Sequence, residues 1–135
     1  EAAKRLADPD SVVFLGRVDE AQRELLLSSA VALVYPSLFE GFGLPPLEAM
    51  SRGTPVVAAR ATSIPEVVGD GGLLVDPLNT AELAEALISV ATDPVLASDL
   101  AERGRRRAAS FSVEATGEAL RASFAAAIDL GERAD

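Results

Sequence analysis

The sequence contains no cysteine and no histidine, and these two absences exclude several kinds of chemistry. Without thiols there are no disulfides and no cysteine nucleophile, and without imidazole there is no Ser/His/Asp triad. A zinc site built on thiolate or imidazole ligands is excluded as well. Any chemistry in this chain must therefore use carboxylates, hydroxyls, arginine and backbone amides.

Positive charge is also scarce, because 12 Lys and Arg residues stand against 21 Asp and Glu residues, a formal net charge of −9. Such a field repels polyanions and offers no counterion release, so we expect no nucleic acid partner. No apolar run reaches the roughly 18 residues that a membrane helix needs, and no basic and apolar leader opens the sequence. We therefore expect a cytoplasmic protein, and leave open a position peripheral to the membrane for the parent protein.

The apolar residues gather in short runs that predict an α/β domain with one core. Four of these runs are typical of buried strands: 12–15, 31–35, 55–59 and 73–75. Helical patterns at 20–29 and 47–52, and a turn-like segment at 64–68, separate them. The alternation of strands and helices predicts a parallel sheet, with strands buried on both faces by flanking helices.

Two pairs of polar residues have the spacing of a capping box at a helix start. Asp19 precedes Gln22 by three residues, and Asn79 precedes Glu82 by the same interval. The cap side chain and the residue three positions later then satisfy each other's backbone N–H groups. We expect helices to begin after Asp19 and Asn79, and a last helix to begin after Ser112.

The C-terminal third, residues 79–130, is predicted to be helical. Its larger apolar residues have spacings that predict a stripe facing the sheet: Leu83, Leu87, Val90, Leu96, Leu100, Phe111, Leu120 and Phe124. The stretch rich in alanine and arginine at Ala101–Ala109 is interpreted as a solvated helix face.

The segment Phe39–Met50, with the sequence FEGFGLPPLEAM, is the main candidate for a site. It follows a predicted strand and opens a helix, so it lies at the carboxyl ends of parallel strands, where open α/β sheets bind ligands. Gly41 and Gly43 lack a Cβ atom, which permits a positive φ and lets a ligand approach the backbone.

An anion at this helix start would be held by backbone N–H groups. Pro45 and Pro46 have none to offer. The donors must therefore be the amides of Phe42, Gly43 and Leu44.

Glu40 and Glu48 are placed on either side of this glycine turn. We expect Glu48 in the first turn of the helix, where the dipole favours an ionised carboxylate that could accept from two neighbouring hydroxyls. The turn can fold Glu40 back toward the same cleft. Two glutamates at this spacing, or a Gly-x-Gly turn, are each weak evidence when taken alone.

In combination, four blocks resemble the retaining family 4 (group 1) glycosyltransferases. They are PS at Pro36–Ser37, the pair Glu40 and Glu48 with GFGLP between them, RGTPVVA at Arg52–Ala58, and IPEVVGDGGLLVDP at Ile64–Pro77. Their order and spacing cover roughly residues 12 to 118. Pro46 departs from the usual apolar residue of the motif, which removes an amide but changes the shape little.

This resemblance implies the Rossmann-like C-terminal half of a GT-B enzyme, which binds a nucleotide diphosphate sugar. Glu40 would be the catalytic residue, holding donor-sugar hydroxyls near the anomeric centre, and Glu48 would accept from the ribose hydroxyls. The amides of residues 42–44 would hold sugar and diphosphate oxygens. Arg17 and Val18 would contact the nucleobase, although Arg17 can equally be an exposed charge beside a turn. Glu66 is a weaker candidate.

The resemblance further implies that residues 1–135 are one partial domain that uses no metal and no cofactor. The N-terminal GT-B domain would supply the acceptor site, so we expect no sugar transfer by the isolated chain. A missing neighbour of the predicted strand 12–15 would leave an open sheet edge that favours self-association. A non-catalytic nucleotide- or sugar-binding or assembly module is the alternative. A receiver-like domain is disfavoured because its acidic cluster and switch lysine are not visible.

Overall fold

The computed structural model describes residues 11–132, which form a three-stranded sheet and six helices. The strands are β1 (Leu33–Tyr35), β2 (Val56–Ala59) and β3 (Leu73–Val75). The helices are α1 (Glu20–Ser29), α2 (Leu44–Arg52), α3 (Ile64–Val68), α4 (Thr80–Thr92), α5 (Pro94–Ala109) and α6 (Val113–Glu132). The segment 64–68, predicted as a turn, is thus a short helix.

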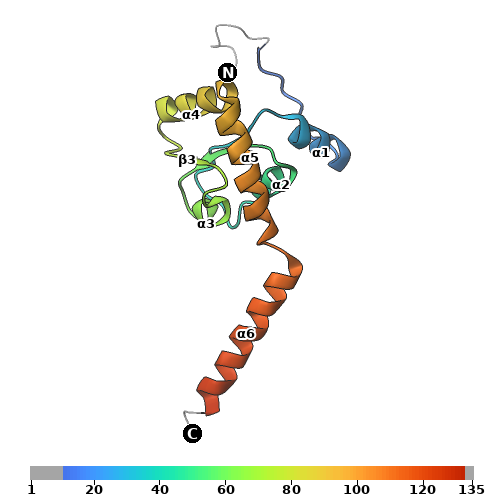
Figure 1. Cartoon of the computed structure of the whole chain (residues 1–135), viewed down its shortest axis with the longest axis vertical. Helices are drawn as coiled ribbons and strands as arrows, with labels where there is room; N and C mark the ends of the chain where they lie inside the picture. Colours follow the sequence, from blue (N-terminus) through green and yellow to red (C-terminus); the bar gives the residue numbers. More distant parts are fainter. Residues whose placement is uncertain (1–10, 133–135) are drawn as a thin grey trace.

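All pairing in the sheet is parallel, and the strand order is β1-β2-β3. Val34 is opposite Val57 in one pair, and Ala58 is opposite Leu74 in the other. Each parallel connection passes through a helix, as this pairing requires (Figure 1). The predicted fold class, a parallel α/β sheet with flanking helices, is confirmed.

The central strand β2 is buried on both faces, and its residues alternate between two cores because side chains of a strand have a period of two. Val56 and Ala58 belong to one core, with Met50 of α2. Val57 belongs to the other core, with Leu100 of α5. The sheet is therefore packed on both faces, and the loops at its carboxyl end project from this packed core.

The predicted strand at 12–15 is wrong, because this segment has no strand partner among the described residues. Val13 is 75% exposed and Phe14 78%. An apolar run indicates burial only where a partner covers it, and here none of the described elements does so. β1 is consequently an edge strand, half-buried rather than buried on both faces as predicted.

The two capping boxes have different outcomes. At α1 the box is complete: Asp19 accepts from the Gln22 N–H at 2.8 Å, and the Gln22 side chain accepts from the Asp19 N–H at 3.0 Å. At α4 only half forms, since Asn79 accepts from the Glu82 N–H but Glu82 accepts instead from the Asp76 N–H. The Asn79 N–H already donates to the Asp76 carbonyl, which leaves Glu82 free for this second role.

The predicted apolar stripe is correct for α4 and α5 and wrong for α6. Val90 and Leu100 are buried, and neighbouring leucines of α4 and α5 pack around them. Leu120 and Phe124, by contrast, are 55% and 63% exposed. Helix α6 extends away from the sheet and its covering helices (Figure 1). None of the described helices is long and apolar enough to cross a membrane.

Candidate functional site

The candidate site begins where β1 ends at Tyr35 and continues to Gly43, the residue before α2. Helix α2 starts at Leu44, three residues earlier than predicted. Two prolines occupy its first turn, where a missing N–H breaks no helical hydrogen bond. As a result Glu48 lies in the second turn, and the prediction that it lies in the first turn is wrong.

Gly43 has a conformation that other residues rarely adopt, with φ 106° and ψ 50°. A Cβ atom at this position would lie 2.7 Å from Cδ1 of Ile64, a buried core residue. Within residues 11–132, the amides of Phe42, Gly43 and Leu44 donate to no protein acceptor. The turn therefore presents three unpaired N–H groups at the N-terminus of α2, where the dipole favours an anion.

Glu40 is held by two hydroxyl groups that the sequence patterns did not identify. Its Oε1 atom accepts from Tyr35 Oη at 2.6 Å and from Ser37 Oγ at 2.8 Å. The bond from Tyr35 and then the bond from Ser37 lower the pKa of Glu40. The hydrogen bond to Glu40, with partial burial and the carboxylate charge, raises the pKa of Tyr35 to about 12. Glu40 is thus ionised at neutral pH.

The backbone of Glu40 is held from the β2–α3 loop. Its N–H donates to Thr62 Oγ1 at 3.1 Å, and its carbonyl accepts from Ser63 Oγ at 3.0 Å. Ser63 also donates to the Phe42 carbonyl at 3.1 Å. Two loops at the carboxyl end of the sheet are therefore joined at Glu40. Only the run of hydroxyl residues at 62–63 could have suggested such a contact from the sequence.

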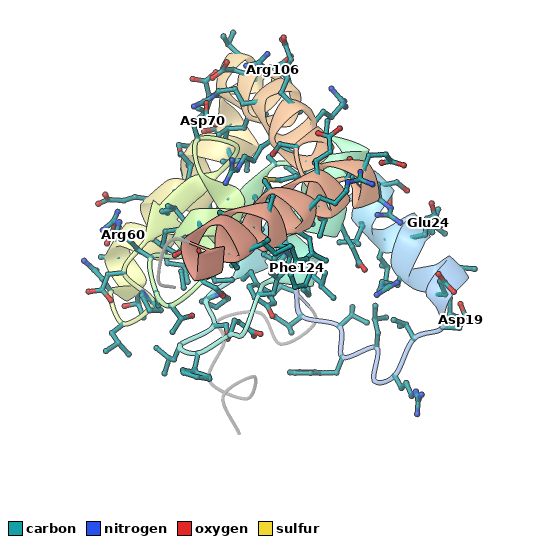
Figure 2. All side chains as sticks on the ribbon, turned by 90° about the horizontal axis from the view of Figure 1, so that it is seen from below. Asp19, Glu24, Arg60, Asp70, Arg106 and Phe124 are labelled. Atoms are coloured by element: carbon teal, nitrogen blue, oxygen red, sulfur yellow. The ribbon has the colours of Figure 1, made fainter. Side chains whose placement is uncertain are left out.

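Glu48 faces a different element, helix α1. Arg23 Nη1 lies 3.2 Å from Glu48 Oε1, and Arg52 Nη2 lies 3.6 Å from Glu24 Oε1. Two ion pairs thus connect α1 and α2. Figure 2 shows Glu24 on α1 at one side of the molecule and Arg60 at the opposite side. Arg23 is 25 positions from Glu48 in the sequence, and no local pattern links them.

Arg17 and Val18 line an open hollow of about 280 Å³ beside α1. The other residues around it are Leu15, Gln22, Leu25 and Leu26. Neither Glu40 nor Glu48 lines this hollow, but α1 supplies both its wall and the arginine that bonds Glu48. Helix α1 therefore links the hollow to Glu48, whereas Glu40 is held by β1 and the β2–α3 loop.

The Phe42 side chain lies against the junction between α5 and α6. Its ring makes an edge contact with Phe111, with centroids 5.9 Å apart, and the Arg107 guanidinium lies 4.9 Å from the Phe111 centroid. Arg107 also donates to the carbonyls of Glu66 and Val67 in α3. The solvated face predicted for this stretch is thus wrong for Arg107, which binds the last carbonyls of α3. Glu66 itself is exposed.

Over residues 11–132, no group of three or more acidic side chains is arranged to hold a metal ion. At the glycine turn the site presents the Glu40 carboxylate, several hydroxyls and unpaired amides, and the Glu48 carboxylate lies in the second turn of α2, facing α1.

Comparisons with known proteins assign this chain to a family. The family model described as glycosyl transferases group 1 matches residues 1–107. The chain is 43% identical over 101 residues to O-antigen chain mannosyltransferase B of Escherichia coli, covering 75% of this chain and 26% of that protein. It is 38% identical over 130 residues to D-inositol 3-phosphate glycosyltransferase of Actinosynnema mirum, covering 95% of this chain and 31% of that protein.

A solved structure, sucrose-phosphate synthase from Thermosynechococcus elongatus, superposes with a TM-score of 0.74 at 36% identity. The match covers 87% of this chain and 31% of the synthase chain. The chain thus spans less than a third of the length of these relatives. Since the family model matches well over half of its residues, the chain belongs to the group 1 glycosyl transferases.

Proposed function

We propose that this chain binds the nucleotide-sugar donor in a retaining, metal-independent family 4 glycosyltransferase that transfers a hexose to an acceptor hydroxyl. One observation carries the proposal: the unpaired amides of residues 42–44 follow Glu40 and precede Glu48 in the chain, in the loop and helix start at the carboxyl end of a parallel sheet. Anions bind at such helix starts, and carboxylates accept from sugar hydroxyls. Together they match a ligand that has phosphates between two sets of hydroxyls.

Each group has a role in this proposal. The three amides bind oxygens of the diphosphate and sugar, and ionised Glu40 accepts from hydroxyls of the donor sugar beside its anomeric carbon. Glu48 accepts from the ribose hydroxyls, which replace Arg23 as its partner. Arg23 and Glu48 are 48% and 27% exposed, and such exposed pairs contribute only about 0–1 kcal/mol, so this exchange is easy. The hollow at Arg17 and Val18 takes the base.

The nature of the sugar and of the partner domain rests on the relatives. Several are named mannosyltransferases, including the MMP alpha-(1->4)-mannosyltransferase of Mycolicibacterium hassiacum, 47% identical over 96 residues. A hexose donor is consistent with these names. Because the chain covers only 23% of that protein and 69% of its own residues take part, we place the acceptor site in another domain. The isolated chain should then transfer no sugar, since both reactants must be held in line.

Donor binding by the full-length parent protein tests the proposal. Calorimetric titration with uridine, guanosine and adenosine diphosphate hexoses should find one that binds. Glu48→Gln should then weaken binding by about 10- to 100-fold, the effect of losing hydrogen bonds to a charged group. Glu24→Gln is the matched control, because Glu24 forms the neighbouring α1–α2 ion pair and loses the same charge. Equal affinities for the two variants would refute the role of Glu48.

A parent protein that binds a donor but transfers no sugar would instead favour a non-catalytic binding or assembly module. Transfer by the purified 135-residue chain would refute the requirement for a second domain.

A further inference from the structure

Glu40 has hydrogen-bonded partners on its side chain, its N–H and its carbonyl, and all of these partners are hydroxyl groups. Tyr35 and Ser37 donate to the carboxylate, Thr62 accepts from the N–H, and Ser63 donates to the carbonyl. Tyr35 and Ser37 come from the end of β1 and the loop after it, and Thr62 and Ser63 come from the β2–α3 loop, more than 20 residues later in the sequence. We call these four residues the hydroxyl cradle.

The cradle leaves the two carboxylate oxygens unequal. Both side-chain donors bind Oε1, whereas Oε2 receives no hydrogen bond from residues 11–132. No arginine or lysine in this part of the chain forms an ion pair with Glu40. The protein therefore fixes the orientation of the carboxylate through neutral donors, and its negative charge is left uncompensated.

Holding the Glu40 side chain in one geometry costs it rotamer freedom. Thr62, which binds the Glu40 N–H, has φ 49°, a strained region that β-branched residues rarely adopt. Strain of this kind gathers at sites where geometry must be held. No other described residue apart from glycine has a positive φ.

We propose that Tyr35, Ser37, Thr62 and Ser63 are positioning residues that hold ionised Glu40 with Oε2 directed at the donor sugar. This inference rests on the proposed function. Tyr35 and Ser37 fix the rotation of the carboxylate, and Thr62 and Ser63 fix the backbone from which it projects. The phosphates, which would be bound by the amides of residues 42–44, do not depend on the two side-chain donors.

Kinetics of the full-length protein separate positioning from binding. Tyr35→Phe and Ser37→Ala should each lower kcat by about 10-fold, the effect of one hydrogen bond to a charged group, and change the donor KM by less than about threefold. Thr92→Val is the matched control, because the exposed Thr92 hydroxyl donates to the Ile88 carbonyl within α4, away from Glu40. Thr92→Val should keep the wild-type kcat.

The acid limb of the pH profile gives a second readout. Tyr35 faces Glu40 from β1, and the hydroxyls of Thr62 and Ser63 face it from the β2–α3 loop. Tyr35 is therefore the only titratable group in the described cradle. Because the donors lower the pKa of Glu40, ionised Glu40 is lost only as pH falls through that lowered value. Removing Tyr35 Oη should shift the acid limb of kcat to higher pH. A merely structural role would leave the limb in place.

The backbone half of the cradle is tested by rescue. Thr62→Ser keeps the hydroxyl and should keep kcat, whereas Thr62→Val removes it and should lower kcat by about 10-fold. Circular dichroism confirms that each variant is folded. If Thr62→Val fails to fold, Ser37→Ala and its pH profile decide alone, because Ser37 is near the surface. Wild-type kcat and an unmoved acid limb in Tyr35→Phe and Ser37→Ala would overturn the inference.

Failure of the proposed function gives a different result, since the wild-type parent protein would then bind no nucleotide sugar. In that case the Tyr35–Glu40 hydrogen bond can still be tested in the 135-residue chain by the absorbance of Tyr35, because Tyr35 is the sole tyrosine and tryptophan is absent. The pKa of Tyr35, measured by ultraviolet titration, should be about 12 in the wild type. In Glu40→Gln it should fall toward the ordinary tyrosine pKa of about 10. An unchanged titration would overturn the Tyr35–Glu40 contact itself.

Discussion

Replacing Gly43 with alanine tests the glycine turn on which the site is built. The backbone there has φ 106°, a strained region for any residue with a side chain, at about 1–3 kcal/mol. The new Cβ would lie 2.7 Å from Ile64 Cδ1. Moving this methyl group off its preferred rotamer adds about 0.5–1.5 kcal/mol. We therefore expect Gly43→Ala to lose about 2–4 kcal/mol of unfolding free energy and about 10 °C in Tm.

Gly41→Ala is the matched control in the same loop. Gly41 has no positive φ, and a Cβ there meets no atom within 4 Å. Its unfolding free energy should stay within about 0.5 kcal/mol of wild type, or rise slightly because alanine restricts the unfolded chain. Urea denaturation followed by circular dichroism measures both variants. If Gly43→Ala is as stable as Gly41→Ala, the reasoning is refuted.

A double-mutant cycle separates backbone strain from collision. Ile64→Val removes Cδ1 and by itself costs about 0.5–1.5 kcal/mol. In this background Gly43→Ala should cost less than in the wild type, by the steric part of about 0.5–1.5 kcal/mol. The remainder is the cost of the left-handed backbone. If the unfolding free energies of the two substitutions were fully additive, the Ile64 side chain would move aside without strain.

Three further predictions concern stability and assembly. Thr54→Val should cost about 1–2 kcal/mol in urea denaturation, because buried Thr54 donates to the Leu27 carbonyl near the end of α1; Thr92→Val is its exposed control. Gly72→Ala should cost about 3 kcal/mol, since its Cβ would lie 2.7 Å from a strand carbonyl oxygen, whereas Gly117→Ala in α6 should gain about 0.5–1 kcal/mol. Light scattering should show self-association of the chain through the exposed apolar segment 12–15, and Phe14→Glu should reduce it; a monomer at all concentrations would contradict this.

Local signals were sufficient for most elements of the fold. The β-branched run of β2, the cap at Asp19 and the glycine at Gly53 each act over a few residues, and each predicted its element well. The predictions that failed concern segments whose structure depends on contacts with residues far away in the sequence. Val12–Leu15 has the composition of a strand but no described neighbour to pair with, and the apolar face of α6 has no described surface to cover.

The site divides in the same way. The glutamates and the glycine turn could be identified from the sequence. Gly43 is glycine for a local reason, because its backbone has a positive φ. What fixes Glu40 in space is not visible, because Thr62 and Ser63 reach it across 22 and 23 residues of sequence. Arg23 reaches Glu48 across a similar interval. The motif thus contains the residues that we propose contact the ligand, but not the residues that hold them in position.

This division explains why substitutions outside the motif should resemble substitutions within it. Thr62 is on the loop after β2, and its only described link to the glycine turn is the Glu40 N–H. Removing its hydroxyl leaves that N–H without a partner and removes one of the two hydrogen bonds that hold the backbone of Glu40. Since catalysis by a positioned carboxylate falls steeply with small misplacements, loss of this one hydroxyl should lower kcat while every motif residue is still present.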